Sequence, residues 1–430
     1  MSTRPSDETQ STSWPLSSHA KSTAPSKYKY YHYDQDGDNP MLPLGPIGLI
    51  DMIGTRDLAE AVNHQLHTRR LQYMESNLDF LQNLPGFLRE DYRLSANCPR
   101  FATGEGRAEL PNTVRGHDLY ILCDVLNYAV TYPFYGLEKP MSPDEHYQDL
   151  KRIILAASGK ARRINVIMPF LYSGRQHKRN ARESLDCAFM LEELAQLGVA
   201  NFLTFDAHDP RVANASPILG FENVMAIYQI IKAMKREMPE LHRHNDRFMV
   251  IAPDEGAMDR AMYFARMLDC PIGTFFKRRD YTRVVDGRNP IISHEFLGED
   301  ARGLSVLIVD DMIASGDSML DIAREMKARH AERVYCTATF ALFTSGLDRF
   351  NQAYQDGIIN RLFATNLTYR SPELLASPWY IDVDLSKYIA LIIDALNHDA
   401  SLSDLLDPSP KIAKLLAAPQ ENASAIATES

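Results

Sequence analysis

Short apolar runs alternate along most of the chain with longer segments whose apolar residues recur at helical spacing. The runs are rich in β-branched residues and are flanked by polar or turn-forming residues, a pattern typical of buried parallel strands. The clearest strand candidates are 118–123, 163–168, 201–205, 248–252, 305–309 and 333–338. Helical spacing is clearest at 184–197, 223–236, 256–268 and 318–329. Strands that alternate with helices predict an α/β fold.

These candidates fall into two similar sets, which predicts two α/β domains, each with a mainly parallel sheet flanked by helices. We expect the first domain at 41–215 and the second at 216–408. Residues 1–40 are rich in Ser, Thr, Pro, Tyr and Asp and contain almost no aliphatic residue. Such a segment cannot bury enough apolar surface to offset its ordering entropy. We therefore expect a disordered extension at 1–40 and a flexible tail at 409–430.

Composition and charge narrow the functional classes. The chain has 430 residues, of which 45% are hydrophobic, and a formal net charge of -10. Proteins that bind nucleic-acid duplexes usually carry a basic patch, so we expect no nucleic-acid partner. The longest apolar runs fall short of the ~18 residues that a membrane-spanning helix needs, and no secretory signal is visible. We therefore expect a cytoplasmic protein without a membrane partner.

The most informative segment spans 304–319 and reads LSVLIVDDMIASGDSM. We expect an apolar strand that ends at Asp310 and Asp311, followed by a loop of small residues and a helix. Ligands of open parallel sheets bind beyond the carboxyl ends of the strands, and the free amides at a helix start favour an anion. Carboxylates are poor phosphate ligands but good acceptors for vicinal hydroxyls, so the segment predicts a site for a phosphorylated sugar. The alternative is an ordinary strand-to-helix turn with an Asp cap.

This segment resembles the ribose-phosphate loop of the type I phosphoribosyltransferases, a family that includes base-transferring enzymes and ribose-phosphate diphosphokinases. The resemblance implies a two-domain phosphoribosyltransferase-like fold in which the loop binds ribose 5-phosphate. Asp317 is an awkward member of the loop, because its charge would repel a phosphate unless its side chain points away. The implied ligands are Asp310, Asp311, Ala314, Ser315, Gly316, Asp317 and Ser318.

Further motifs follow the order found in ribose-phosphate diphosphokinases and cover about residues 98–406. A base-transferring enzyme would need only the second domain, so this ordered set favours the diphosphokinases. The motifs are RFATGEGR at 100–107, VRGHDLYI at 114–121, PFLYSGRQHKR at 169–179, FDAH at 205–208, APDEGA at 252–257 and KRR at 277–279.

The resemblance also assigns roles on the ATP side. Donors placed after a strand end suit a polyphosphate, and Mg²⁺ is implied at His208 and Asp254. Lys277 and Arg279 precede a polar, turn-prone segment that resembles a mobile lid, and they would supply positive charge at the attacked phosphorus. The implied ATP ligands are Phe101, Thr103, Glu105, Arg175, Gln176 and His208. The first three of these would reach the adenine of ATP on a neighbouring subunit, which implies a homo-oligomer.

The activity implied by the resemblance is transfer of the β,γ-diphosphoryl group of ATP to the 1-hydroxyl of ribose 5-phosphate. Two alternatives remain open: a base phosphoribosyltransferase, and a non-catalytic regulatory partner of a diphosphokinase. A regulatory relative would be expected to lose the basic triplet or the Asp pair, and this chain has both. The chain departs from the family pattern at His177, where an aspartate is expected, and at Ala257, where a glycine is usual. The insertion at 127–146 has no counterpart in the family pattern.

Overall fold

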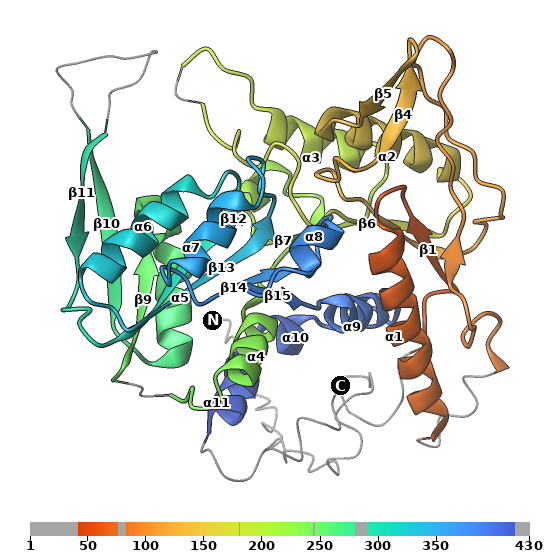
Figure 1. The fold of residues 1–430 in the computed structure, drawn as a ribbon. Coiled ribbons are helices and arrows are strands. Elements are labelled where there is room, and N and C mark those ends of the chain that lie inside the picture. The colour runs from red at the N-terminus through yellow and green to blue at the C-terminus, as the bar shows by residue number, and fades with distance from the viewer. Residues whose placement is uncertain (1–41, 76–82, 180, 244–245, 280–290, 418–430) are drawn as a thin grey trace, which may run out of the picture. The chain divides into compact units, whose positions relative to one another are not determined.

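The structure of the protein is a computed structural model, drawn in Figure 1. It describes residues 42–75, 83–179, 181–243, 246–279 and 291–417, with the backbone alone at 74–75, 277–279 and 291–294. The expected N-terminal extension at 1–40 and residues 418–430 of the expected tail lie outside the described residues. The described residues from Pro43 onward form one compact unit.

A six-stranded parallel sheet occupies the first half of the chain, with the strand order β2-β1-β3-β6-β7-β8. Successive side chains of each strand point to opposite faces. Ile121 and Phe202 pack with helices α2 and α3, whereas Tyr120 and Leu203 belong to the core that α1 covers. The elements are β1 (Ile47–Asp51), α1 (Arg56–Glu75), β2 (Arg93–Leu94), β3 (Asp118–Leu122), α2 (Pro143–Ala157), β6 (Arg163–Ile167), α3 (Asp186–Gln196), β7 (Asn201–Phe205) and β8 (Gly220–Val224).

A seven-stranded sheet follows, with the order β11-β10-β9-β12-β13-β14-β15. Only the pairing of β10 with β11 is antiparallel among these strands. Val306 and Cys336 pack with α6 and α7, and Leu307 and Tyr335 share the other core with α4 and α5. The elements are α4 (Ile227–Glu237), β9 (Phe248–Ala252), α5 (Met258–Leu268), β10 (Ile272–Arg279), β11 (Ile291–Leu297), β12 (Ser305–Ile313), α6 (Asp317–Ala328), β13 (Arg333–Ala341), α7 (Asp348–Gln355), β14 (Arg361–Thr365), α8 (Pro372–Leu375) and β15 (Tyr380–Val383).

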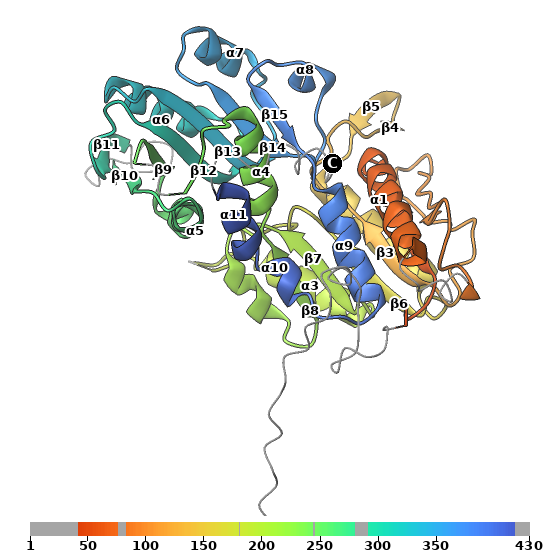
Figure 2. The same cartoon turned by 90° about the horizontal axis from the view of Figure 1, so that it is seen from below.

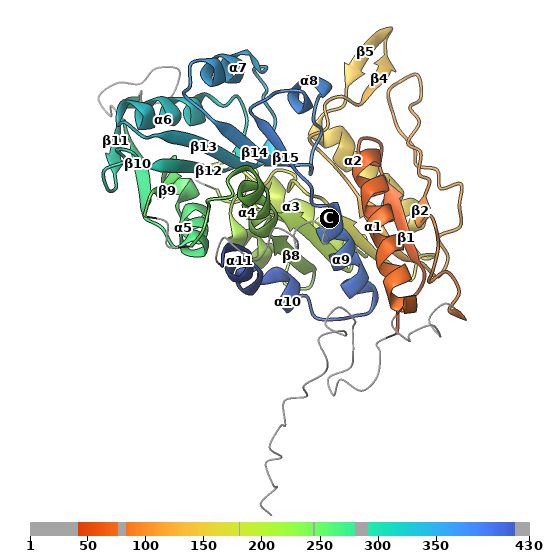
Figure 3. The same ribbon diagram turned by 60° about the horizontal axis from the view of Figure 1, so that its bottom comes forward.

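Helix α9 (Ser386–Asn397) joins the two sheets. It follows β15 in the chain but packs lengthwise against α1, as Figures 2 and 3 show from two directions. Asn397 donates from Nδ2 to the carbonyl of Gly45 (3.0 Å), and Arg163 donates from Nη2 to the carbonyl of Leu396 (2.6 Å). This helix lies within the range expected for the second domain, 216–408, but it packs on the first sheet.

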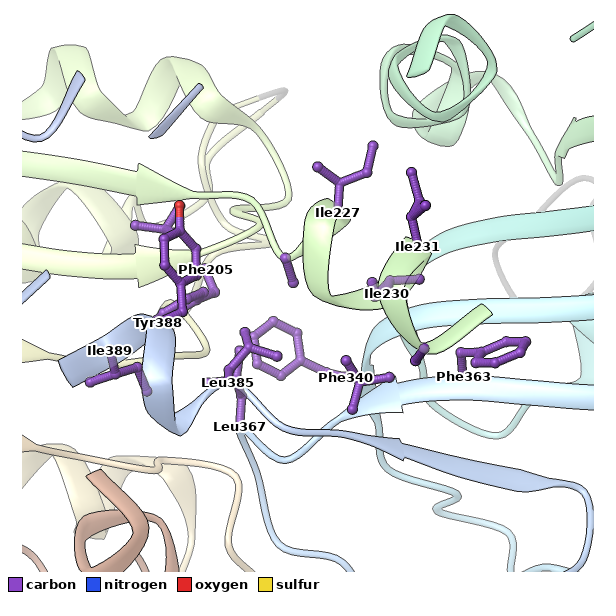
Figure 4. Close-up of a cluster of buried hydrophobic side chains, with 14 of the residues drawn as sticks. Phe205, Ile227, Ile230, Ile231, Phe340, Phe363, Leu367, Leu385, Tyr388 and Ile389 are labelled. Atoms are coloured by element: carbon purple, nitrogen blue, oxygen red, sulfur yellow. The ribbon is translucent and has the colours of Figure 1, made fainter. Parts of the chain in front are cut away.

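One apolar core continues from the first sheet to the second. Figure 4 shows Phe205, which ends β7, close to Phe340 of β13 and to Leu385, which precedes α9. Helix α4 contributes Ile227 and Ile230 to the same cluster. The carboxyl ends of β7 and β13 are therefore held near each other by buried side chains rather than by the connecting chain alone.

The expected α/β class with mainly parallel sheets is confirmed. All the strand candidates correspond to strands, and the helical segments correspond to α3, α4, α5 and α6. Residues 409–416, expected within a flexible tail, form helix α11 (Ser409–Leu416), which buries Ile412 and Leu416 and follows the short helix α10 (Ser403–Leu406). Along the described residues, no helix combines the length and the apolar character that crossing a bilayer requires.

Candidate active site

The site forms where the carboxyl end of β7 meets that of β12. His208 follows β7, and Asp311 lies in β12. Nδ1 of His208 lies 2.7 Å from Oδ2 of Asp311, so the ring donates to the carboxylate and presents Nε2 on its other side. The Asp311 side chain is buried, while that of His208 is 42% exposed. The structure thus brings together two residues that the sequence assigned to different substrates.

Strand β12 does not end at the two aspartates as we expected. Asp310, Met312 and Ile313 all pair with β13, so the strand continues to Ile313. Asp310 accepts a hydrogen bond from the amide of Asp311 (2.9 Å). The strand prediction was too short because adjacent carboxylates are unusual inside a strand and were interpreted as its end.

Burial and hydrogen bonding set the charges of these groups. Burial, followed by the neighbouring charge of Asp311, raises the pKa of Asp310. Burial would raise the pKa of Asp311 as well, but the hydrogen bond from His208 and the charge of Arg260 lower it. The same hydrogen bond raises the pKa of His208 against the opposing effect of burial. Asp311 is therefore the ionised member of the Asp310–Asp311 pair, and its charge favours the imidazolium form of His208.

A buried network beside this pair was missed by the sequence analysis. Asp206 accepts hydrogen bonds from Arg260 Nε (2.8 Å) and from the Thr339 hydroxyl (2.6 Å). Although burial disfavours its charge, the ion pair with Asp206 raises the pKa of Arg260. The network links the end of β7 with α5 and β13. Asp206 lies in the FDAH motif and Arg260 follows the APDEGA motif by three residues, but nothing local in the sequence pairs them or selects Thr339.

The loop after β12 has the geometry expected of an anion site. Gly316 has a φ of 86°, and a Cβ there would lie 2.3 Å from the Phe350 ring. Helix α6 begins immediately after it: the Asp317 amide donates weakly to the Ser315 hydroxyl (3.5 Å), and Gly316 at the N-cap has no side chain to accept from the next amides, which can donate to an anion. Asp317 forms an ion pair with Arg349 and accepts a hydrogen bond from Ser315 (3.0 Å). The Arg349 contact offsets the charge that made Asp317 awkward. Ala314 and Ser318 lie in the same loop and first turn.

The segment after β6 approaches β12 from the first sheet. Arg175 contacts the sulfur of Met312 through Nη2. Gln176 donates from Nε2 to the carbonyl of Ser184 (2.8 Å), so its side chain is engaged locally. His177 lies with Nε2 3.2 Å from Oδ2 of Asp209. The imidazoles of His177 and His208 are 5.7 Å apart between ring centroids. Arg175 and His177 therefore lie next to the His208–Asp311 pair, and the ATP-binding roles of Arg175 and Gln176 stay predictions.

The structure does not bring the predicted metal residues into a preformed cage. Asp254, after β9, accepts a hydrogen bond from the amide of Gly256 (3.0 Å) at the start of the 3-10 helix η4 (Glu255–Ala257). Among the described residues, no group of three or more His, Cys, Asp or Glu side chains could hold a metal ion. Mg²⁺ keeps several waters and is usually bound by one or two carboxylates with substrate phosphates. The donors His208 and Asp254 fit this ion only as partial ligands completed by substrate.

The loop that carries Phe101, Thr103 and Glu105 is closed by its own hydrogen bonds. The Phe101 amide donates to the Glu105 carbonyl (2.7 Å), and the Thr103 hydroxyl donates to the Glu105 carboxylate (2.9 Å). The Phe101 side chain is 52% exposed, with the Arg107 guanidinium 5.6 Å from its ring centroid. In the described contacts this loop makes no hydrogen bond to the His208–Asp311 pair. Its prediction as an adenine site stays a prediction.

Lys277 and Arg279 lie at the edge of the described structure. Their backbone belongs to β10, which pairs with β11, rather than to a loop. Their side chains and residues 280–290, the proposed lid, lie outside the described residues. The catalytic prediction for the two residues stays a prediction.

Comparisons with known proteins identify the family. Residues 47–198 match the N-terminal domain of ribose phosphate pyrophosphokinase, and residues 221–349 match the phosphoribosyl transferase domain. A ribose-phosphate pyrophosphokinase of Vibrio parahaemolyticus is 27% identical over 322 residues, which covers 73% of this chain and 91% of the relative. One from a Nostoc species is 25% identical over 350 residues, covering 80% of this chain and 94% of the relative.

A solved structure supports the fold. The phosphoribosylpyrophosphate synthetase of Mycobacterium smegmatis superposes with a TM-score of 0.65 at 18% identity, covering 83% of this chain and all of that one. The two domain matches lie in the order of the two sheets, and together they cover more than half of the chain. The chain therefore belongs to the ribose-phosphate pyrophosphokinase family.

Proposed function

We propose that the protein is a ribose-phosphate diphosphokinase that transfers the β,γ-diphosphoryl group of ATP to the 1-hydroxyl of ribose 5-phosphate. The products are phosphoribosyl pyrophosphate and AMP. The observation that carries the proposal is the 2.7 Å contact between His208 and Asp311, because it joins a motif of the ATP side to a motif of the ribose side. The names of the relatives support the same activity.

On the ribose side, the first amides of α6 and the hydroxyls of Ser315 and Ser318 hold the 5-phosphate. Asp310 and Asp311 accept hydrogen bonds from the 2- and 3-hydroxyls. Asp311 has two carboxylate oxygens, so it can keep His208 on Oδ2 while Oδ1 accepts a hydroxyl. The ion pair of Asp317 with Arg349 supports this assignment, since it reduces the negative charge near the phosphate.

On the ATP side, Arg175, Gln176 and His208 bind the polyphosphate. Asp254 and His208, the latter in its neutral form with Nδ1 donating to Asp311, would hold Mg²⁺ together with phosphate oxygens of ATP, and the ion would add positive charge there when bound. Phe101, Thr103 and Glu105 bind the adenine of ATP on a neighbouring copy, so the active protein is a homo-oligomer. The exposed Phe101 ring, in a loop closed by its own hydrogen bonds, supports a contact outside this chain.

In the reaction the 1-hydroxyl attacks the β-phosphorus in line. A new oxygen–phosphorus bond forms, the bond from the β-phosphorus to the oxygen of the leaving AMP breaks, and the hydroxyl proton is released. Lys277 and Arg279 stabilise the negative charge that develops on the transferred group. Positioning and electrostatics carry most of the catalysis, without a covalent intermediate.

A coupled assay with ATP, Mg²⁺ and ribose 5-phosphate tests the proposal by following AMP and phosphoribosyl pyrophosphate together. We expect both products from the wild type, their loss in Lys277→Ala, and no change in Lys160→Ala, which removes an exposed lysine at a turn after α2. A protein that binds ribose 5-phosphate but releases no AMP would contradict the proposal. Restored activity on adding a second diphosphokinase chain would then indicate a regulatory partner, and ATP-independent use of phosphoribosyl pyrophosphate with a base would indicate a base transferase.

A further inference from the structure

The insertion at 127–146, which the family pattern left without a role, is a folded hairpin. In the part of the chain that the structure describes, strands β4 (Thr131–Phe134) and β5 (Leu137–Pro140) pair only with each other. Val130, Tyr132 and Met141 form a small core of their own at the base of the hairpin, with Phe134 packed against it. The hairpin ends at Ser142, whose side chain caps α2. It is therefore anchored at its base to a helix of the first sheet (Figure 1).

Glu145, in the first turn of α2, holds the two strands of the hairpin to this helix. Its carboxylate accepts hydrogen bonds from the Tyr132 hydroxyl, from Lys139 Nζ (2.9 Å) and from the Ser142 amide (2.8 Å). Partial burial alone would raise its pKa, but these hydrogen bonds lower the pKa of Glu145 to about 2. One ionised side chain thus ties both strands of the hairpin to the helix.

The hairpin packs directly on the loop that carries Phe101. Gly104, in the middle of that loop, has a φ of 89°, and a Cβ there would lie 2.6 Å from the Phe134 ring. The Phe134 ring therefore covers the Cα of Gly104. The Gly104 amide donates to the Phe101 carbonyl (2.8 Å), so the turn that fixes the Phe101 backbone includes the residue under the ring.

A second contact holds the base of the same loop. The Arg100 guanidinium donates to both oxygens of the buried Asp149 (2.8 Å each) and lies 5.2 Å from the centroid of the Tyr132 ring. A Cβ at Gly106 would lie 2.4 Å from Nη1 of Arg100. Arg100 and Gly106 face each other across the loop in an antiparallel bridge. The base of the loop is therefore supported by Asp149 of helix α2 and Tyr132 of the hairpin, and its turn is supported by Phe134 of the hairpin.

We propose that the β4–β5 hairpin positions the Phe101–Glu105 loop for the base of the nucleotide, and that Phe134 is a positioning residue for nucleotide affinity and base selection. The inference rests on the proposed function, in which this loop binds adenine. A loop that is ordered before binding does not lose conformational freedom on binding, so the support acts on affinity. Removing the Phe134 ring frees the turn at Gly104 and lets the exposed Phe101 ring take other orientations.

Steady-state kinetics of Phe134→Ala test the inference. We expect the KM for ATP to rise about tenfold and the preference for ATP over GTP to fall, because an unsupported loop is ordered only on binding. The KM for ribose 5-phosphate and the melting temperature should change little. Leu137→Ala is the matched control, since Leu137 pairs with Phe134 in the hairpin but is 72% exposed. Phe134→Tyr keeps the ring and should restore the wild-type KM.

An unchanged KM for ATP in folded Phe134→Ala would overturn the inference, as would equal changes in the KM values of both substrates. An equal effect of Leu137→Ala would also overturn it, because that effect would not depend on the contact with Gly104. If Phe134→Ala does not fold, Phe134→Leu replaces it with the same criteria. If the wild type releases no AMP, the proposed function fails, but the inference can still be tested by ATP binding. A dissociation constant for ATP that is tenfold higher in Phe134→Ala than in the wild type would support the inference. An unchanged dissociation constant, or no ATP binding by the wild type, would overturn it.

Discussion

Nδ1 of His208 donates to Oδ2 of Asp311 across the junction of the two sheets, at 2.7 Å. The hydrogen bond orients the imidazole so that Nε2 faces away from Asp311. Asp311→Asn keeps the shape of the acceptor but removes its charge, and hydrogen bonds to charged groups contribute about 1.5–3 kcal/mol. We expect kcat/KM for ATP to fall about ten- to a hundredfold in this variant, measured in the coupled assay.

A double-mutant cycle separates this coupling from a role of either residue alone. His208→Asn removes the ring. The kcat/KM of the double variant should be only slightly lower than that of the less active single variant, because both substitutions break the same interaction. If the two effects multiply instead, His208 and Asp311 act independently, and the orientation role of Asp311 is wrong.

Gly316→Ala tests the packing of the phosphate loop. Alanine at a φ of 86° is strained, and its Cβ would meet the Phe350 ring at 2.3 Å. We expect the free energy of unfolding to fall by about 2–4 kcal/mol, from backbone strain and overpacking together. The KM for ribose 5-phosphate should rise, since the loop leads into the amides of α6.

Gly303→Ala is the control for that experiment. Gly303 has a φ of 72°, but no atom of the described residues lies within 4 Å of the place that a Cβ would take there. The substitution should cost about 1 kcal/mol from backbone strain alone and leave both KM values unchanged. Equal losses in the two variants would show that the Phe350 contact contributes nothing to the loop.

The parts of the fold that the sequence predicted are those with a local signal. The apolar run before Asp310 predicted β12 and its site, because strand composition and the adjacent loop are contiguous in the chain. The Asp206–Thr339 hydrogen bond joins residues far apart in the sequence, and no local pattern links them. The packing of α9 on α1 is set by tertiary contacts for the same reason. The β4–β5 hairpin was missed because β4 contains Pro133 and its exposed strands lack an apolar run.

Asp394→Asn tests the junction between α1 and α9. The Asp394 carboxylate is fully buried, where it pairs with Arg69 and Arg70 and accepts a hydrogen bond from the Tyr73 hydroxyl (2.9 Å). Removing one member of a buried ion cluster leaves charge uncompensated and typically costs about 3–5 kcal/mol. We expect a loss of this size in the apparent free energy of unfolding, measured by urea titration and circular dichroism.

The matched control for the junction is Asp399→Asn. Asp399 pairs with Arg163 but its side chain is 58% exposed, so solvent screens the pair and the loss should stay below about 1 kcal/mol. Similar losses in both variants would mean that the buried cluster does not hold α9 on the first sheet.

Asp124, which follows β3, gives a prediction for the pH dependence of stability. It is buried, and burial raises its pKa to about 6, against the hydrogen bonds from the amide of Leu126 and from Thr368 and Tyr369. The folded protein therefore holds this proton more tightly than the unfolded chain, whose carboxyl titrates near pH 4. Asp124 therefore contributes up to about 3 kcal/mol to the free energy of unfolding below pH 4. This contribution is lost as the pH rises from 4 through about 6.

The measurement is the free energy of unfolding of wild type and Asp124→Asn between pH 4 and pH 7. The asparagine does not titrate, so the difference between the two proteins should shift in favour of the variant by up to about 3 kcal/mol as the pH rises. Thr368→Val removes a donor to the carboxylate (3.0 Å), which raises the pKa of Asp124 further and moves the loss to higher pH. A difference between wild type and Asp124→Asn that stays constant with pH would mean that the carboxylate remains ionised in the folded protein throughout this range.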